Sequence, residues 1–107
     1  RRKPQFVTNQ LKIADLTLDR DTRIVTRAGK EISLSSKEFM VLECLMRNQN
    51  IVMTRQQIEQ NAWNYDYEGG SNVIDVYIRY LRKKIDAGYE KKLIHTVRGT
   101  GYVMREE

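Results

Sequence analysis

The side chains best suited to bind another molecule are basic residues in the last third of this 107-residue chain. Between Asn72 and Arg105 there are eight basic and three acidic residues, whereas the rest of the chain carries eleven of each sign. A positive charge confined to one part of a chain is typical of a surface that faces the phosphates of nucleic acid. A solvent-exposed face that binds nothing could show the same excess, so charge alone leaves both interpretations open.

The other reactive side chains do not support a catalytic or metal-binding function. The only histidine, His95, falls within a predicted strand and points outward, and no serine or cysteine is placed as its nucleophile partner. The only cysteine, Cys44, lies on a helix that is apolar on two faces and is interpreted as a small buried hydrophobic residue. Asp66 and Glu68 lack further ligands and are interpreted as solvated charges. We therefore expect no enzyme activity, no metal and no cofactor.

Four of these basic residues belong to a helix predicted from about Asn72 to Asp86. On a helical wheel its apolar residues form one buried stripe, which comprises Ile74, Ile78, Leu81 and Ile85. The opposite face presents Asn72, Val76, Arg79, Lys83 and, to one side, Tyr80, with Tyr77 and Arg82 at the edges. Arginine, lysine, asparagine and valine can contact base edges or phosphates in a major groove. The alternative is an ordinary solvent face with Tyr80 packed on a neighbour.

Ahead of this helix, the pattern predicts a small sheet and two further helices. Alternating apolar residues over 6–35, with a turn at Ala28–Lys30, predict antiparallel strands. Ser35–Glu38 and Thr54–Gln57 each have the spacing of a capping box, so a helix is expected to begin at each of them. Residues 51–53, just before the second of these helices, are interpreted as a short apolar connector.

The end of the chain predicts a hairpin. Two short apolar runs between Leu93 and Met104 flank the turn residues Gly99-Thr100-Gly101. The order is therefore sheet, three helices and hairpin, with a polar, glycine-rich loop at 64–71 between the second and third helices. This is the order of a winged helix-turn-helix, an α+β fold.

Length and composition fit one globular domain. The chain has 40% hydrophobic and 31% charged residues, and its apolar runs are too short for a membrane span or a signal peptide. A single cysteine cannot form an internal disulfide, which favours a cytoplasmic location. The start, Arg1–Pro4, is typical of a linker. We therefore expect a linker remnant at 1–7, a domain at 8–105, and a chain that is a fragment of a longer protein or a processed product.

Two strings are distinctive at their spacing: NVIDVYIRYLRKKI at 72–85 and TVRGTGY at 96–102. Together with Leu34–Phe39, Thr54–Arg55 and Ala62–Trp63, they resemble the effector domain of OmpR/PhoB-type two-component response regulators over nearly the whole chain. The resemblance implies an N-terminal four-stranded antiparallel sheet, three helices and a C-terminal β-hairpin wing. It also implies that the third helix enters the major groove of DNA, while the wing lies over the neighbouring minor groove.

By motif match, the resemblance implies a set of DNA-contacting residues: Arg55, Trp63, Asn72, Val76, Arg79, Tyr80, Arg82, Lys83, Thr96, Arg98 and Thr100. Val76 would contact a base methyl, and Arg98 at the wing tip would enter the minor groove, where narrow A/T-rich segments attract arginine. Tyr80 stands where some relatives carry a base-reading arginine, so its role stays open. The residues implied to contact the DNA backbone are Arg55, Trp63 and Thr96.

The resemblance also implies partners. The loop residues Tyr65, Asp66, Tyr67 and Glu68 match a segment with which some relatives engage RNA polymerase. In the family, a sensor kinase phosphorylates an N-terminal receiver domain, which drives dimerisation on tandem half-sites. We therefore expect double-stranded promoter DNA with direct repeats, a head-to-tail homodimer on that DNA, and a kinase that acts on a receiver domain absent from this chain. The alternative function is a winged helix whose basic surface binds an acidic protein.

Overall fold

A four-stranded antiparallel sheet opens the computed structural model, which describes residues 10–62 and 72–106. Its strands lie in chain order and are β1 (Gln10–Ile13), β2 (Leu16–Asp19), β3 (Val25–Arg27) and β4 (Lys30–Ile32). Buried and half-buried side chains alternate along β2 and β3, because successive side chains of a strand point to opposite faces. Leu16, Leu18 and Val25 therefore point into the core. The sheet expected from the family resemblance is confirmed.

Three helices follow, as predicted. They are α1 (Ser36–Arg47), α2 (Arg55–Ala62) and α3 (Asn72–Leu81), and a π-helical turn, η2 (Arg82–Asp86), continues α3. Both predicted capping boxes are present. The side chains of Ser35 and Glu38 each accept a hydrogen bond from the other's backbone N–H at the start of α1, and Thr54 and Gln57 do the same at the start of α2.

The last turn of the predicted third helix is wider than an α-helix. The backbone N–H of Ala87 donates to the carbonyl of Arg82, five residues earlier, at 2.8 Å. In this wider turn both Ile85 and its neighbour Asp86 are buried, whereas the wheel placed only Ile85 inside. The chain then turns away at Gly88, whose φ of +87° suits glycine.

The second sheet has three strands, of which the sequence pattern predicted two. Strands β6 (Ile94–Val97) and β7 (Gly101–Met104) form the expected hairpin, hereafter the wing, and β5 (Met53–Thr54) pairs antiparallel with β7. The interpretation of residues 51–53 as a connector is therefore wrong for Met53, which pairs with Tyr102. A strand of two residues is too short to show an alternating pattern, and its partner lies far along the chain.

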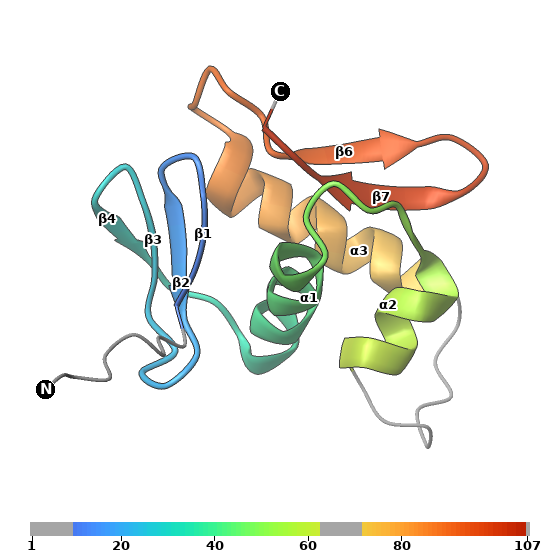
Figure 1. Ribbon diagram of the computed structural model, residues 1–107, viewed down its shortest axis with the longest axis horizontal. Helices are drawn as coiled ribbons and strands as arrows, with labels where there is room; N and C mark the ends of the chain where they lie inside the picture. The colour runs from blue at the N-terminus through green and yellow to red at the C-terminus, as the bar shows by residue number, and fades with distance from the viewer. Residues whose placement is uncertain (1–9, 63–71, 107) are drawn as a thin grey trace, which may run out of the picture.

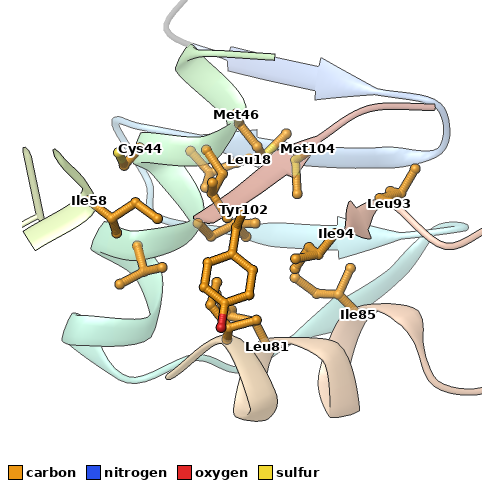
Figure 2. Packing of buried hydrophobic residues seen from close by; sticks show 14 of the residues in the cluster. Leu18, Cys44, Met46, Ile58, Leu81, Ile85, Leu93, Ile94, Tyr102 and Met104 are labelled. Carbon is orange, nitrogen blue, oxygen red and sulfur yellow. The ribbon is translucent and has the colours of Figure 1, made fainter. Parts of the chain in front are cut away.

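The core lies around α1. Figure 1 shows α1 between the first sheet and α2, with the wing running alongside α3. Val41, Leu42 and Leu45 of α1 are fully buried, and Cys44 is as well, which confirms that this helix is covered on two sides. Figure 2 shows Cys44 among the packed core side chains. Burial raises the pKa of its thiol to about 11, because the thiolate would lose its hydration. Cys44 is therefore a core residue.

Strand β7 approaches β5 so closely at Gly101 that no side chain fits between them. A Cβ on Gly101 would overlap the carbonyl oxygen of Met53 and lie 2.9 Å from its carbonyl carbon. Both are backbone atoms of Met53, so no side-chain rotation can relieve the overlap. We expect Gly101→Ala to lower the free energy of unfolding by about 3 kcal/mol, measured by urea denaturation.

Gly99 in the same hairpin provides the control for this substitution. A Cβ there meets nothing within 4 Å, although the φ of +77° is unfavourable for alanine. Gly99→Ala should therefore cost only about 1–2 kcal/mol. If the two substitutions cost the same, the close approach of β5 and β7 would not limit the residue at position 101.

Candidate nucleic-acid interface

Helix α3 separates a buried side from a cationic side. Ile74, Ile78 and Leu81, with Ile85 in η2, are at most 1% exposed, which confirms the predicted stripe. The packing of a helix against the core by one stripe fixes which of its other residues face outward. The rotation of α3 about its own axis is therefore set by these four residues.

The outward side of α3 carries most of the predicted contact residues. Arg79 and Lys83 are exposed, and Val76 is half-buried rather than fully exposed as the wheel suggested. Tyr80 is 43% exposed while its ring meets Tyr77 edge to face, with centroids 5.9 Å apart. Tyr80 thus combines both interpretations drawn from the sequence, because it packs on a neighbour and still presents an exposed ring.

The wing turn presents a second group of predicted contact residues. Arg98 and Thr100 are exposed in the turn that joins β6 to β7. The turn is closed by a hydrogen bond from the backbone N–H of Thr100 to the carbonyl of Val97 at 3.0 Å. Gly99 between them has a φ of +77°, which glycine adopts without strain. Arg98 therefore projects from a short, defined turn.

A carboxylate on α3 joins the first turn of that helix to the wing and to α2. The hydroxyl of Tyr102 in β7 donates to Oδ1 of Asp75, and Nε of Arg55, the first residue of α2, donates to the same oxygen at 2.9 Å. Figure 2 shows the Tyr102 ring extending from its strand toward α3. Burial alone would raise the pKa of Asp75, but the bonds from Tyr102 and Arg55 hold it below its ordinary value of 3.8.

Arg82 holds the wing at a second point. Its Nη2 donates to Oγ1 of Thr96 at 2.5 Å and to the carbonyl of Ile94 at 3.3 Å. The guanidinium carbon also lies 5.7 Å from the centre of the Tyr102 ring, within the range of a cation–π contact. Arg82 and Thr96 were both predicted to contact DNA, and the structure shows that they also bond to each other. Their structural role was not predicted.

A third contact, which the sequence analysis missed altogether, lies at the end of η2. The carboxylate of Asp86 accepts hydrogen bonds from the backbone N–H groups of Leu93 and Ile94, both at 3.1 Å. Arg27 in β3 donates to the same carboxylate at 3.3 Å and is only 1% exposed. The sequence held a usable indication, because Arg27 follows Val25 by two residues in a strand and must share its inward face.

A groove of about 540 Å³ lies between α3, η2 and β6. Its basic lining residues are Arg79, Arg82, Lys83, Lys92 and His95. Arginine and lysine in an open groove are suited to bind the phosphates of a nucleic-acid backbone. The groove therefore continues the cationic side of α3 toward the wing.

The other predicted site residues fall in three groups. The side chain of Arg55 is exposed, and it forms an ion pair with the carboxylate of Asp75. Asn72 is the first residue of α3. Outside the described residues lie Trp63, Tyr65, Asp66, Tyr67 and Glu68.

The described residues, 10–62 and 72–106, contain neither a cluster of metal ligands nor a membrane-spanning helix. Within these ranges, no three histidine, cysteine, aspartate or glutamate side chains lie close enough together to hold a metal ion. None of the helices there combines the length and the apolar character that crossing a bilayer requires. Nε2 of His95, in β6, lies 3.3 Å from the carbonyl oxygen of Arg105.

The contact of Tyr102 with Asp75 predicts a change in acid stability. Because the pKa of Asp75 is lowered on folding, the stability it provides is complete above about pH 4 and is lost as the pH falls through the lowered value. Tyr102→Phe removes one of the bonds that lower the pKa. We therefore expect it to reduce the melting temperature more at about pH 7 than at about pH 3, measured by circular dichroism.

Tyr89→Phe is the matched control for this measurement. The hydroxyl of Tyr89 donates to the backbone carbonyl of Arg27 at 3.5 Å and not to a carboxylate. Its loss should lower the melting temperature equally at both pH values. An equal effect of Tyr102→Phe at both pH values would show that its hydroxyl does not stabilise the charged form of Asp75.

Comparison with known proteins agrees with this geometry. Residues 29–104 match the family described as "Transcriptional regulatory protein, C terminal". The chain is 50% identical over 96 residues to the response regulator MprA of Mycobacterium sp., which covers 90% of this chain and 42% of MprA. It thus spans less than half the length of this relative.

Two solved structures share the fold. DrrB of Thermotoga maritima, described as an OmpR/PhoB homolog, matches with a TM-score of 0.80 and 30% identity, over 91% of this chain and 44% of DrrB. The DNA-binding domain of Klebsiella pneumoniae RstA, solved in complex with the RstA box, matches with a TM-score of 0.78 and 30% identity, over 90% of this chain and 96% of that domain. The chain therefore belongs to the C-terminal, winged-helix DNA-binding domains of OmpR/PhoB-type response regulators, a family of transcription regulators and not of enzymes.

Proposed function

We propose that this chain binds double-stranded promoter DNA in a sequence-specific manner, with α3 in the major groove and Arg98 of the wing in the minor groove. The observation that carries the proposal is that the exposed cationic side of α3 and the wing turn are held in a fixed relation by Asp75, Arg82 and Asp86. The major and minor grooves of one duplex lie at a set distance from each other. A protein that contacts both must therefore hold its two contacting elements at a fixed separation. The similar DNA-binding domain of RstA, solved in complex with the RstA box, supports the same function.

Within this proposal the predicted residues take different roles. Val76, half-buried on the outward side of α3, is suited to touch a thymine methyl, and Tyr80 presents an exposed ring beside it. Because Nε of Arg55 is used by Asp75, its Nη groups would be the ones to reach a phosphate. The remaining proposed contacts are Trp63, Asn72, Arg79, Arg82, Lys83, Thr96 and Thr100.

The wider context is proposed on the family alone. We infer that 8–105 is the output domain of a cytoplasmic two-component regulator, preceded by a linker remnant at 1–7. A receiver domain and a sensor kinase would control it, and it would assemble head-to-tail on direct repeats. The loop residues Tyr65–Glu68 are the proposed contact with RNA polymerase.

Salt dependence separates DNA binding from the alternative of an acidic protein partner. We expect the chain to bind a random duplex at about 50 mM salt, with an affinity that falls on a log–log plot by about 0.9 per phosphate contact. Fluorescence anisotropy with a labelled duplex measures this slope. If no duplex binding is seen at about 50 mM salt, the proposed function is wrong, and the basic surface serves another partner.

Arg98→Ala tests the minor-groove contact. We expect it to weaken binding to a duplex selected from a random library, by about tenfold with A/T-rich flanks and less with G/C-rich flanks, because narrow A/T-rich grooves attract arginine. Arg47→Ala removes an exposed charge at the last residue of α1. It should leave the difference in affinity between the A/T-rich and G/C-rich duplexes as it is in the unmodified chain. Equal losses on both flanks would argue against insertion of Arg98.

Val76→Glu tests the major-groove face. A carboxylate at this position would face phosphates, so we expect specific binding to be lost while the melting temperature stays within a few degrees of the unmodified chain. Val76→Thr keeps a methyl group and nearly the same size, and should retain binding. A large drop in the melting temperature of Val76→Glu would place this side chain in the core and withdraw it from the proposed face.

A further inference from the structure

Arg27 is the most buried charged side chain among residues 10–62 and 72–106, with 1% exposure. Its guanidinium donates in three directions. Nε donates to Asp15 at 2.7 Å, Nη1 to the carbonyl of Ile85 at 2.8 Å, and Nη2 to the carbonyl of Lys91 at 2.7 Å. A buried guanidinium loses its hydration and must bond its donors within the protein. The planar fork therefore fixes the positions of the groups around it.

Two of these partners, the carbonyls of Ile85 and Lys91, belong to η2 and to the segment that leads from it into the wing. The ring of Tyr89 lies against the guanidinium, with its centre 4.4 Å from the guanidinium carbon. Nζ of Lys92 bonds back to the carbonyls of Asp86 and Tyr89, at 3.0 and 2.8 Å. Arg27 of the first sheet thus positions the segment that connects α3 and η2 to the wing.

The same network reaches the first residues of the wing. Nη1 of Arg27 lies 3.3 Å from Oδ1 of Asp86, and that carboxylate accepts the backbone N–H groups of Leu93 and Ile94. Ile94 is the first residue of β6, and the strand runs from there to Val97, immediately before Arg98. The position of β6 at its base is therefore set by a carboxylate whose own position is set by Arg27.

We propose that Arg27 is a positioning residue for DNA binding, which sets the place of Arg98 relative to α3 through Asp86 and β6. The inference rests on the proposed function. Arg27 itself lies in the first sheet and is buried, so it touches no DNA. A buried ion pair contributes little net stability compared with an apolar replacement, but it specifies one arrangement of its surroundings. A lysine at this position would carry all its donors on one nitrogen, so it could not reach the partners that the separate nitrogens of the planar guanidinium reach.

A double-mutant cycle between Arg27→Lys and Arg98→Ala tests this role. The probe is a duplex with A/T-rich flanks, selected from a random library by the unmodified chain. We expect Arg27→Lys to weaken binding about fivefold or more when Arg98 is present, and about twofold or less in the Arg98→Ala background. Arg20→Lys is the matched control, because Arg20 also belongs to the first-sheet region, directly after β2, but pairs with Glu43, at 3.2 Å, on the surface. It should change affinity by less than about twofold in both backgrounds.

A second readout distinguishes positioning from a merely structural role. We expect Arg27→Lys to shift the backbone amide resonances of Leu93, Gly99 and Thr100 in NMR spectra of the folded, DNA-free chain, and Arg20→Lys to leave them in place. If Arg27→Lys does not fold, Asp15→Ala replaces it in the same cycle. The Asp15 side chain is 48% exposed, and its loss frees only Nε of Arg27, so a smaller loss of affinity in the same direction is expected.

The outcomes separate the two proposals. Equal losses from Arg27→Lys in both backgrounds, or unmoved wing resonances in a variant that folds, would overturn the positioning role and leave the proposed function intact. Failure of the unmodified chain to bind any duplex would overturn both. A loss of affinity that depends on Arg98, together with shifted wing resonances, supports the positioning role.

Discussion

A hairpin and a helix that contact one duplex must keep a set distance from each other, and the polar contacts between α3 and the wing provide that constraint here. Asp75, Arg82 and Asp86 follow one another along α3 and η2, and each bonds to a different point of the hairpin. Two of the three are carboxylates on a side of the molecule that is otherwise basic. Each carboxylate is matched by an arginine, Arg55 or Arg27, so neither charge is left unpaired.

The contacts are polar for a physical reason. The apolar surface beneath the wing, where Figure 2 shows Tyr102 beside Leu81 and Ile94 beside Ile85, supplies most of the attraction between the two elements, but hydrophobic contact has little directional preference. Hydrogen bonds depend on both distance and angle, so they select one position among those that the apolar surface allows. The charged groups therefore define the geometry, while the core provides the stability.

Several side chains serve both the fold and the proposed interface. Arg55, Arg82 and Thr96 are proposed to contact DNA, and each also bonds within the chain. A substitution at any of them would change both a DNA contact and the position of the wing. Their effects on affinity would therefore report two causes. Val76 is apolar and Arg98 is exposed in the wing turn, so substitutions there report the proposed contact with DNA more directly.

Local patterns in the sequence were enough to predict much of the molecule. The capping boxes at Ser35 and Thr54, the apolar stripe of α3 and the wing turn at Gly99 were all predicted, because each depends on residues within a few positions of one another. The exposed Arg79 was placed by the same reasoning, whereas Arg98 was implied as a site residue by the family resemblance. The family resemblance added the fourth strand of the first sheet, and with it the complete architecture.

The tertiary structure decided the pairing of β5 with β7, the π-helical turn, and the bonds of Asp75 and Arg27. The strand pairing and the bonds of Asp75 and Arg27 join groups that lie far apart along the chain, whereas the π-helical turn is closed by a bond over five residues that the helical wheel did not anticipate. Alternation could place Arg27 on an inward face, but it could not say that Asp86 and the carbonyl of Lys91 would meet it there. The sequence by itself determined most of the helices and strands and the apolar residues that they bury, since those follow from local spacing. The partners of a buried charge are decided only by which backbone and side-chain groups the folded chain brings within hydrogen-bond distance.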